Sequence, residues 1–137
     1  MIDRELIVRR ILDGLPQAQA VYLFGSSATG AMRGDSDIDI AVLLPPAIAR
    51  EAGTLAGQPL HLGLESALSC DVDLINLREA PTVFQKEIVI EGDRMFCADE
   101  AAADEFEMLV LSFYQKLNAE RAGILAEGMA SGHFLQA

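Results

Sequence analysis

The sequence predicts an α/β fold of the α+β type, in which a small mixed or antiparallel sheet is covered by helices on one face. Two observations predict this fold. Short apolar segments rich in β-forming residues alternate with amphipathic helical segments, and the last helical segment is far longer than the others. A chain of 137 residues supports a single buried core. We therefore expect one domain over residues 1–137, with a core at about 1–97, a long helix at about 101–127 and a frayed tail at 128–137.

The first two elements are an amphipathic helix and a buried strand. Apolar residues fall on one helical face over residues 3–13, and Gly14 and Pro16 then end the helix. Residues 20–24 read Ala-Val-Tyr-Leu-Phe, a short apolar run rich in β-formers, which predicts a buried strand. The strand stops abruptly at Gly25, and the sequence specifies the following turn or short helix poorly.

The second strand, at residues 36–44, has a pattern that separates its two faces. Because side chains alternate along a strand, Ile38 and Ile40 point one way while Asp37 and Asp39 point the other. Two prolines directly after this segment end the strand. The two carboxylates therefore share one face of the predicted sheet.

The remaining elements follow in the order helices, strand, helix, edge strand and long helix. They are expected at residues 48–68 with a break at Gly57 and Pro59, then at 71–77, 81–90, 94–97 and 101–127. The long helix carries an apolar stripe at three- to four-residue spacing, formed by Phe106, Val110, Phe113, Leu117 and Ile124. We expect this stripe to pack first on the core and then to extend toward a partner.

The chain is strongly acidic, with 21 Asp and Glu against 10 Lys and Arg and a formal net charge of −11. A surface of this charge repels nucleic-acid backbones, so we expect no direct DNA or RNA binding. A basic partner protein fits better, and any bound phosphate needs a metal ion to offset the charge. No apolar run approaches the ~20 residues needed to cross a bilayer, and the N-terminus lacks the pattern of a signal peptide. The expected location is the cytoplasm.

Three features converge on one candidate site. Gly25 and Ser26 form a tight turn after a strand, where glycine lets a phosphate approach the backbone and the hydroxyl and N–H groups can donate to it. Asp37 and Asp39 place two carboxylates on one strand face, and a third comes from Asp73 on a later strand. Neighbouring Asp71 has the same parity as Asp73 and is the alternative third carboxylate.

These carboxylates predict a magnesium-dependent reaction at phosphate. Carboxylates gathered in one pocket repel each other, and Mg²⁺ removes this conflict because it binds hard oxygen ligands. Two such ions about 3.5–4 Å apart stabilise the attacking and leaving oxygens of phosphoryl transfer. The third carboxylate can also position or deprotonate the attacking hydroxyl. Manganese suits the same oxygen ligands.

Simpler interpretations of these residues exist. Asp37 and Asp39 alone would suit the solvated face of an ordinary half-exposed strand, and Gly25 with Ser26 alone would suit a simple turn. Their spacing, with a strand before and a strand after, favours the metal site. Ser36 either contacts phosphate or merely leads into the strand, with a slight preference for the latter.

Two segments resemble a known family. Leu23-Phe24-Gly25-Ser26, followed by Ser36-Asp37-Ile38-Asp39-Ile40-Ala41-Val42, is similar to the signature of minimal nucleotidyltransferases of the DNA polymerase beta superfamily. The segments at 71–77 and 114–121 resemble the MntA-type antitoxins in particular. The resemblance covers nearly the whole chain and implies a polymerase-beta-like nucleotidyltransferase core followed by the long C-terminal helix.

The resemblance also implies roles for individual residues. Gly25 and Ser26 would hold the triphosphate of ATP, Asp37 and Asp39 would bind Mg²⁺, and Asp73 would be the third carboxylate. One departure concerns the basic contact to the triphosphate, because Thr29 stands where related sequences often have arginine soon after Gly-Ser. Arg33 could take that role.

The implied function is that of an antitoxin. MntA-type proteins transfer AMP from ATP to a tyrosine of a HEPN-domain toxin of the HepT type and so silence it. The alternatives are an antitoxin that neutralises its toxin by contact alone, and a transferase acting on a small molecule such as an antibiotic. The small-molecule enzymes of the superfamily usually carry an extra acceptor domain, for which this chain has no room. We find no Arg-x4–6-His-x-Tyr segment, so the toxin is expected on another chain.

Overall fold

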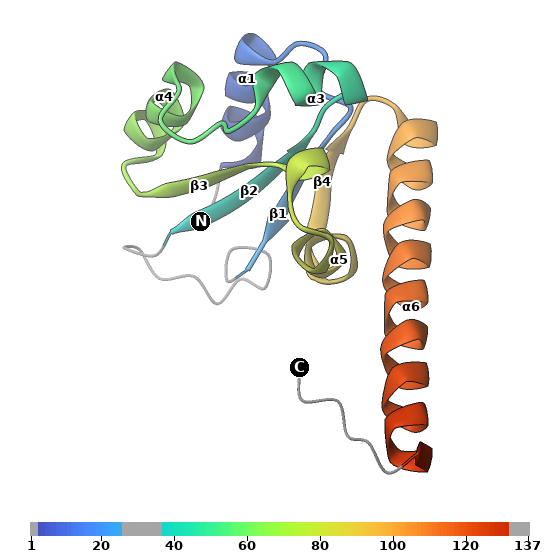
Figure 1. Ribbon diagram of the computed structural model, residues 1–137. Helices are drawn as coiled ribbons and strands as arrows, with labels where there is room; N and C mark the ends of the chain where they lie inside the picture. Colours follow the sequence, from blue (N-terminus) through green and yellow to red (C-terminus); the bar gives the residue numbers. More distant parts are fainter. Residues whose placement is uncertain (1–2, 26–36, 132–137) are drawn as a thin grey trace.

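The computed structural model describes residues 3–25 and 37–131, with side chains described as far as Arg121. Within these residues, four strands form one sheet in the order β3-β2-β1-β4, and helices pack on it (Figure 1). The strands are β1 (Ala20–Phe24), β2 (Ile38–Leu43), β3 (Val72–Asn76) and β4 (Asp93–Cys97). Strand β1 pairs antiparallel with β2 and with β4, whereas β2 and β3 run parallel. The sheet is therefore mixed, and β4 is an edge strand, as the sequence predicts.

Three helices cover one face of the sheet. They are α1 (Arg4–Gly14), α3 (Pro46–Ala52) and α4 (Pro59–Leu68). Asp3 caps α1, since its carboxylate accepts a hydrogen bond from the Leu6 N–H at 3.1 Å. Pro46 and Pro59 stand in the first turns of α3 and α4, where the missing proline N–H costs no hydrogen bond.

The opposite face of the sheet is also covered, so the expectation of helices on one face was wrong. A 3₁₀ turn (Leu77–Glu79) leads to α5 (Thr82–Glu91), and β4 is followed by α6 (Glu100–Ser131). The two central strands are apolar on both sides, and Tyr22, Ala41 and Leu43 form a second core with residues of α5 and α6. The separate core under α1, α3 and α4 contains Ile38, Ile40 and Val42. A sheet that is apolar on both faces must be covered twice.

Helix α6 departs from the prediction in two respects. It continues to Ser131, so residues 128–131, expected to be frayed, extend it, and its distal half runs beyond the sheet (Figure 1). Phe106 and Val110 are buried as predicted, whereas Phe113 is 57% exposed, although it follows Phe106 by seven residues and so lies on nearly the same side of the helix. No helix among the described residues combines the length and apolar character needed to cross a membrane.

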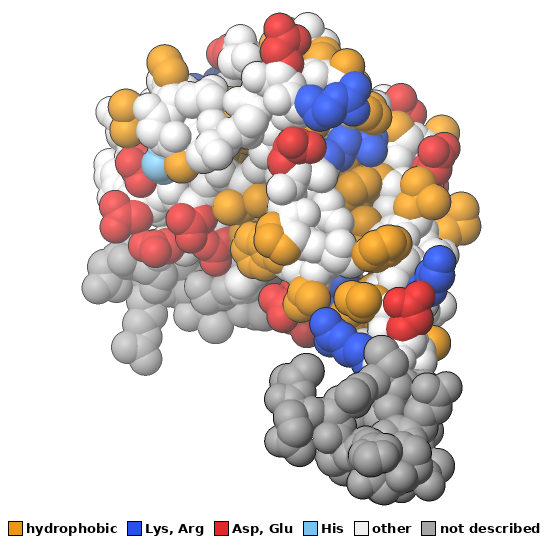
Figure 2. Space-filling view, in the orientation of Figure 1, with side chains coloured by type: hydrophobic (Ala, Val, Ile, Leu, Met, Phe, Trp, Pro, Cys, Tyr) orange, Lys and Arg blue, Asp and Glu red, His pale blue; other side chains and the backbone are white. Residues whose placement is uncertain are grey.

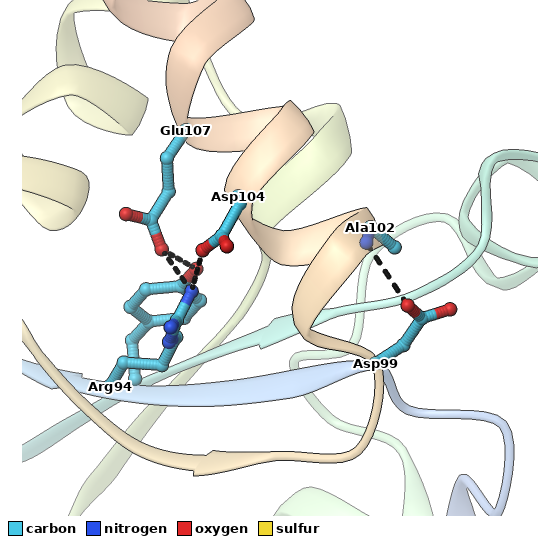
Figure 3. A network of polar contacts seen from close by, with 6 residues as sticks. Arg94, Asp99, Ala102, Asp104 and Glu107 are labelled. Atoms are coloured by element: carbon cyan, nitrogen blue, oxygen red, sulfur yellow. Dashed lines mark hydrogen bonds and ion pairs between the residues drawn. The ribbon is translucent and has the colours of Figure 1, made fainter.

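A polar network attaches the start of α6 to the sheet (Figure 3). The Tyr22 hydroxyl of β1 donates to Glu107 Oε2 at 2.7 Å. Arg94 of β4 donates to the same Glu107 oxygen at 2.9 Å and to Asp104 Oδ1 at 3.0 Å. Asp99 caps α6 by accepting from the Ala102 N–H at 3.0 Å. These contacts fix α6 against β1 and β4, and α5 packs beside it.

Candidate active site

The carboxylates of the predicted site come together at the end of the sheet where β2 and β3 begin. Asp39 and Asp73 lie directly opposite each other in the parallel register of these two strands. Their side chains are close enough to share a hydrogen bond, and the charge of Asp37, one residue before β2, also acts on Asp39. Asp37 and Asp73 are exposed, while Asp39 is half-buried. Acidic side chains gather on this edge of the molecular surface, at the left of Figure 2.

The electrostatics of this group are unfavourable as it stands. The pKa of Asp39 is raised to about 6, first by burial, then by the hydrogen bond and the negative charge of Asp73, and finally by the charge of Asp37. A carboxyl group with this pKa keeps a small protonated fraction near neutral pH. A divalent cation would reverse the balance by stabilising the charged form.

Gly25 brings the backbone directly against this carboxylate. It ends β1 with a positive φ of 65°, a conformation that L side chains rarely adopt. A Cβ atom at this position would collide with Asp39 Oδ2 and lie 3.3 Å from Asp39 Cγ. Because Phe24 is the register partner of Asp39, the turn follows immediately beside the carboxylate. Both backbone conformation and space therefore require glycine here.

A pocket of about 340 Å³ opens between the strand ends and α5. It is lined by Phe24, Gly25, Asp39, Asp73, Phe84, Glu87 and Glu91. The rings of Phe24 and Phe84 pack edge to face, with centroids 5.5 Å apart and an angle of 86° between the ring planes. The pocket thus joins an acidic strand edge, a glycine turn and an aromatic pair.

The donor set fits a hydrated magnesium ion better than a closed metal cage. Within residues 3–25 and 37–131, no three Asp, Glu, His or Cys side chains are gathered closely enough to hold a metal by themselves. Asp39 and Asp73 supply neighbouring oxygen ligands, and Asp37 adds charge at the same edge. Mg²⁺ usually takes one or two carboxylates and completes its shell with waters and substrate phosphates. The arrangement is compatible with such an ion.

The structure separates the two candidates for the third carboxylate. Asp73 lines the pocket opposite Asp39, whereas Asp71 precedes β3 and its backbone carbonyl accepts a hydrogen bond from the Ile38 N–H at 3.0 Å. Both side chains have the same parity in sequence, so only the pairing register distinguishes them. The geometry favours Asp73.

The other predicted residues lie outside the described part of the chain. This applies to Ser26 and Ser36, which were expected to contact the nucleotide, and to Thr29 and Arg33.

Three pocket residues were not expected from the sequence, namely Phe84, Glu87 and Glu91. Their spacing of three and four residues on one helix was the available signal, but only the packing of α5 shows that this face meets the strand ends.

Comparison with known proteins now identifies the family. Residues 8–101 match the family model described as polymerase beta, nucleotidyltransferase. The chain belongs to this family. It is therefore a nucleotidyltransferase.

Several individual proteins are similar over nearly their whole length. Protein adenylyltransferase MntA of Shewanella oneidensis is 37% identical over 131 residues, which cover 95% of this chain and 90% of that protein. A crystal structure of a toxin–antitoxin with AMP-PNP has a TM-score of 0.75 and 36% identity, with coverage of 93% of this chain and 99% of the other.

A third similar structure is a complex of an antitoxin with an AMPylated toxin. It is the MNT antitoxin in complex with the tri-AMPylated HEPN toxin of Shewanella oneidensis, with a TM-score of 0.65 and 35% identity. The match covers 92% of this chain and 95% of the other. The two structures resemble this chain in both sequence and fold.

Proposed function

We propose that this protein is an MntA-type antitoxin that transfers AMP from ATP to a tyrosine of a HEPN-domain toxin of the HepT type. The observation that carries the proposal is the 37% identity with a protein adenylyltransferase over 95% of the chain. The geometry of Gly25, Asp39 and Asp73 supports it, because these residues meet in one pocket. The reaction takes place in the cytoplasm, where ATP is available.

The predicted site residues would have separate roles in this reaction. Asp37, Asp39 and Asp73 would hold Mg²⁺, two ions in all, which when bound offset the charge of the triphosphate and polarise the phosphate under attack. Gly25 lets the turn lie directly against the Asp39 carboxylate, since a side chain at this position would collide with it. Ser26, by the family resemblance, would help to hold the triphosphate, and Ser36 is a further candidate for a hydrogen bond to phosphate.

The transfer forms one bond and breaks another. The tyrosine oxygen of the toxin forms a bond to the α-phosphorus of ATP, the bond from that phosphorus to the bridging oxygen breaks, and pyrophosphate leaves with the electron pair. Asp73 would take the proton of the tyrosine hydroxyl, and its position opposite Asp39 and its exposure support this role. The chain itself thus supplies positioning, charge and a proton acceptor.

The surface offers a place for a protein partner. Hydrophobic side chains are exposed over α5 and α6 (Figure 2). They are Val83, Ile90, Met108, Leu109 and Phe113, each at least 45% exposed. Exposed apolar groups on two adjacent helices are typical of a protein–protein contact. This surface adjoins the pocket through α5, so a bound toxin can reach the site.

The test is the intact mass of the cognate HEPN toxin after incubation with this protein, ATP and Mg²⁺. AMP-sized increments are expected with the unmutated protein and not with the Asp37→Asn/Asp39→Asn variant. The same variant is tested for suppression of toxicity. Suppression without any mass increment would replace this proposal with neutralisation by contact, provided that both proteins are folded and bound to each other.

A further inference from the structure

We infer that one face of α5, formed by Phe84, Glu87 and Glu91, is the acceptor wall of the active site and selects an aromatic hydroxyl flanked by basic side chains. This inference rests on the proposed function. It concerns the acceptor side of the reaction, which neither the glycine turn nor the strand carboxylates explain.

The pocket has two walls of different character. One wall is the strand edge with Gly25, Asp39 and Asp73, and the other is α5. Phe84, Glu87 and Glu91 follow each other at spacings of three and four residues, so they lie along one side of the helix. The buried Ile88 anchors the helix on the second core, while the acceptor wall stays open to the pocket. The position of this wall is therefore fixed by packing.

The charges on α5 suit an acceptor better than a nucleotide. Glu87 and Glu91 are exposed, and neither takes part in an ion pair with another described residue. Two carboxylates one helical turn apart repel each other and also repel a triphosphate. An arginine or lysine of the acceptor would relieve this repulsion.

Phe84 provides the apolar part of the same wall. Its ring is half-buried and packs edge to face on Phe24, and the remaining surface lines the pocket beside Asp39 and Asp73. An aromatic ring placed on this pair gains favourable edge-to-face contacts. A phenol ring held there points its hydroxyl toward the strand carboxylates, whereas its basic neighbours in sequence meet Glu87 and Glu91. The wall thus matches a tyrosine in a basic segment.

The experiment measures initial rates of AMP transfer to the cognate HEPN toxin while toxin and ATP are varied separately. In the Glu87→Gln/Glu91→Gln variant, we expect the KM for toxin to rise about tenfold, since each lost charge pair at an exposed rim contributes modestly. The KM for ATP should stay the same or fall, because two charges that repel the triphosphate are removed. The dependence of the toxin KM on salt should also weaken.

Controls separate the acceptor wall from general effects of charge and folding. The Asp13→Asn/Glu51→Gln variant removes two exposed carboxylates from α1 and α3, on the other face of the sheet, and should keep both KM values. Phe84→Leu keeps an apolar side chain and should also raise the KM for toxin more than that for ATP. Thermal unfolding of each variant confirms that it is folded.

The outcomes are distinct. An unchanged KM for toxin in the Glu87→Gln/Glu91→Gln variant would overturn the inference, while AMP transfer by the unmutated protein would leave the proposed function intact. A rise in the KM for ATP instead would assign this face of α5 to the nucleotide and also overturn the inference. Absence of any transfer by the unmutated protein would refute the proposed function and the acceptor wall with it.

Discussion

Two groups of acidic side chains lie near the sheet, and they differ in how their negative charge is compensated. Asp104 and Glu107 of α6 surround Arg94, which donates a hydrogen bond to each. The other group, which we call the strand-edge carboxylates, consists of Asp37, Asp39 and Asp73. There the charges acting on Asp39 are those of the other two members and have the same sign. One group contains its cation, whereas the other is suited to receive one.

The pKa values of the two groups show the same contrast. Hydrogen bonding to Asp104 is the main reason that the pKa of Arg94 is raised, so its charged form is stabilised. The pKa of Tyr22 is raised by burial and then by its hydrogen bond to Glu107, so the hydroxyl stays protonated as a donor. The pKa of Asp39, in contrast, rises because its charged form is penalised. An acidic group whose charge is compensated by a cation of the protein supports the fold. An acidic group whose charge is not compensated provides a site for chemistry.

The largest effect on AMP transfer is expected from removing one of the strand-edge carboxylates. We expect Asp39→Asn to lower the rate of AMP transfer by at least ~10²-fold, since it removes a preorganised electrostatic contact to the phosphates. The measurement is the initial rate of mass increase of the toxin at saturating ATP. The variant should fold, because it loses repulsion rather than packing. Full activity of a folded Asp39→Asn protein would contradict the role of this residue.

Removal of Arg94, the cation of the other acidic group, should lower stability and leave AMP transfer unchanged. Arg94→Met should lower the free energy of unfolding by about 1–2 kcal/mol, because it leaves the partly buried Glu107 without its charged partner. AMP transfer per folded molecule should be retained. Urea denaturation measures the loss, and Arg50→Met, at an exposed arginine of α3 without an ion pair to any described residue, is the matched control. Equal effects of the two substitutions would show that the network contributes little to stability.

Magnesium should stabilise the protein through the strand-edge carboxylates and not through the group around Arg94. At a concentration ten times its dissociation constant, Mg²⁺ should raise the free energy of unfolding of the unmutated protein by about 1.4 kcal/mol. The Asp39→Asn/Asp73→Asn variant should show no such gain, whereas Arg94→Met should keep it. Thermal unfolding with and without a chelator gives the three values. A gain of the same size in the double variant would place magnesium binding elsewhere.

The smallest effect is the pH dependence of the metal-free protein. A folded-state pKa of about 6 for Asp39 lies above the value near 4 of an unfolded aspartate. Below pH 4 the carboxyl group is protonated in both the folded and the unfolded state, so it does not change the free energy of unfolding. As pH rises through 6 it becomes charged in the folded state, so its full unfavourable contribution is present above pH 6.

Asp39→Asn removes this contribution. In the presence of a chelator, the variant should match the unmutated protein near pH 4 and exceed its stability above pH 6 by about 1 kcal/mol, because solvent screening at a half-buried site reduces the full value of two pKa units. Urea titrations at the two pH values measure the difference. A gain that is independent of pH would show that it does not come from the charge of Asp39.

Local patterns predicted most of the elements. The strand at residues 20–24 was predicted with its observed bounds, and alternation correctly placed Ile38 and Asp39 on opposite faces of β2. Pro59 was recognised at the start of a new helix, where it stands in α4. These features depend on neighbours within a few residues, so they can be inferred without knowledge of the fold. The coverage of the second face and the exposure of Phe113 could not, because they depend on which surfaces meet.

Some features of the candidate site likewise follow from local sequence, and others depend on packing. The sequence by itself determined the strand, the glycine turn and the carboxylate pair, because each follows from residue type and the two-residue period of a strand. Tertiary structure decided that Asp73 rather than Asp71 faces Asp39, since pairing register is a contact between segments more than thirty residues apart. It also decided that Gly25 packs on that carboxylate and that α5 forms the second wall of the pocket. Local sequence encodes which groups a strand end carries, but only the packing of β1, β2, β3 and α5 determines which of those groups share one space.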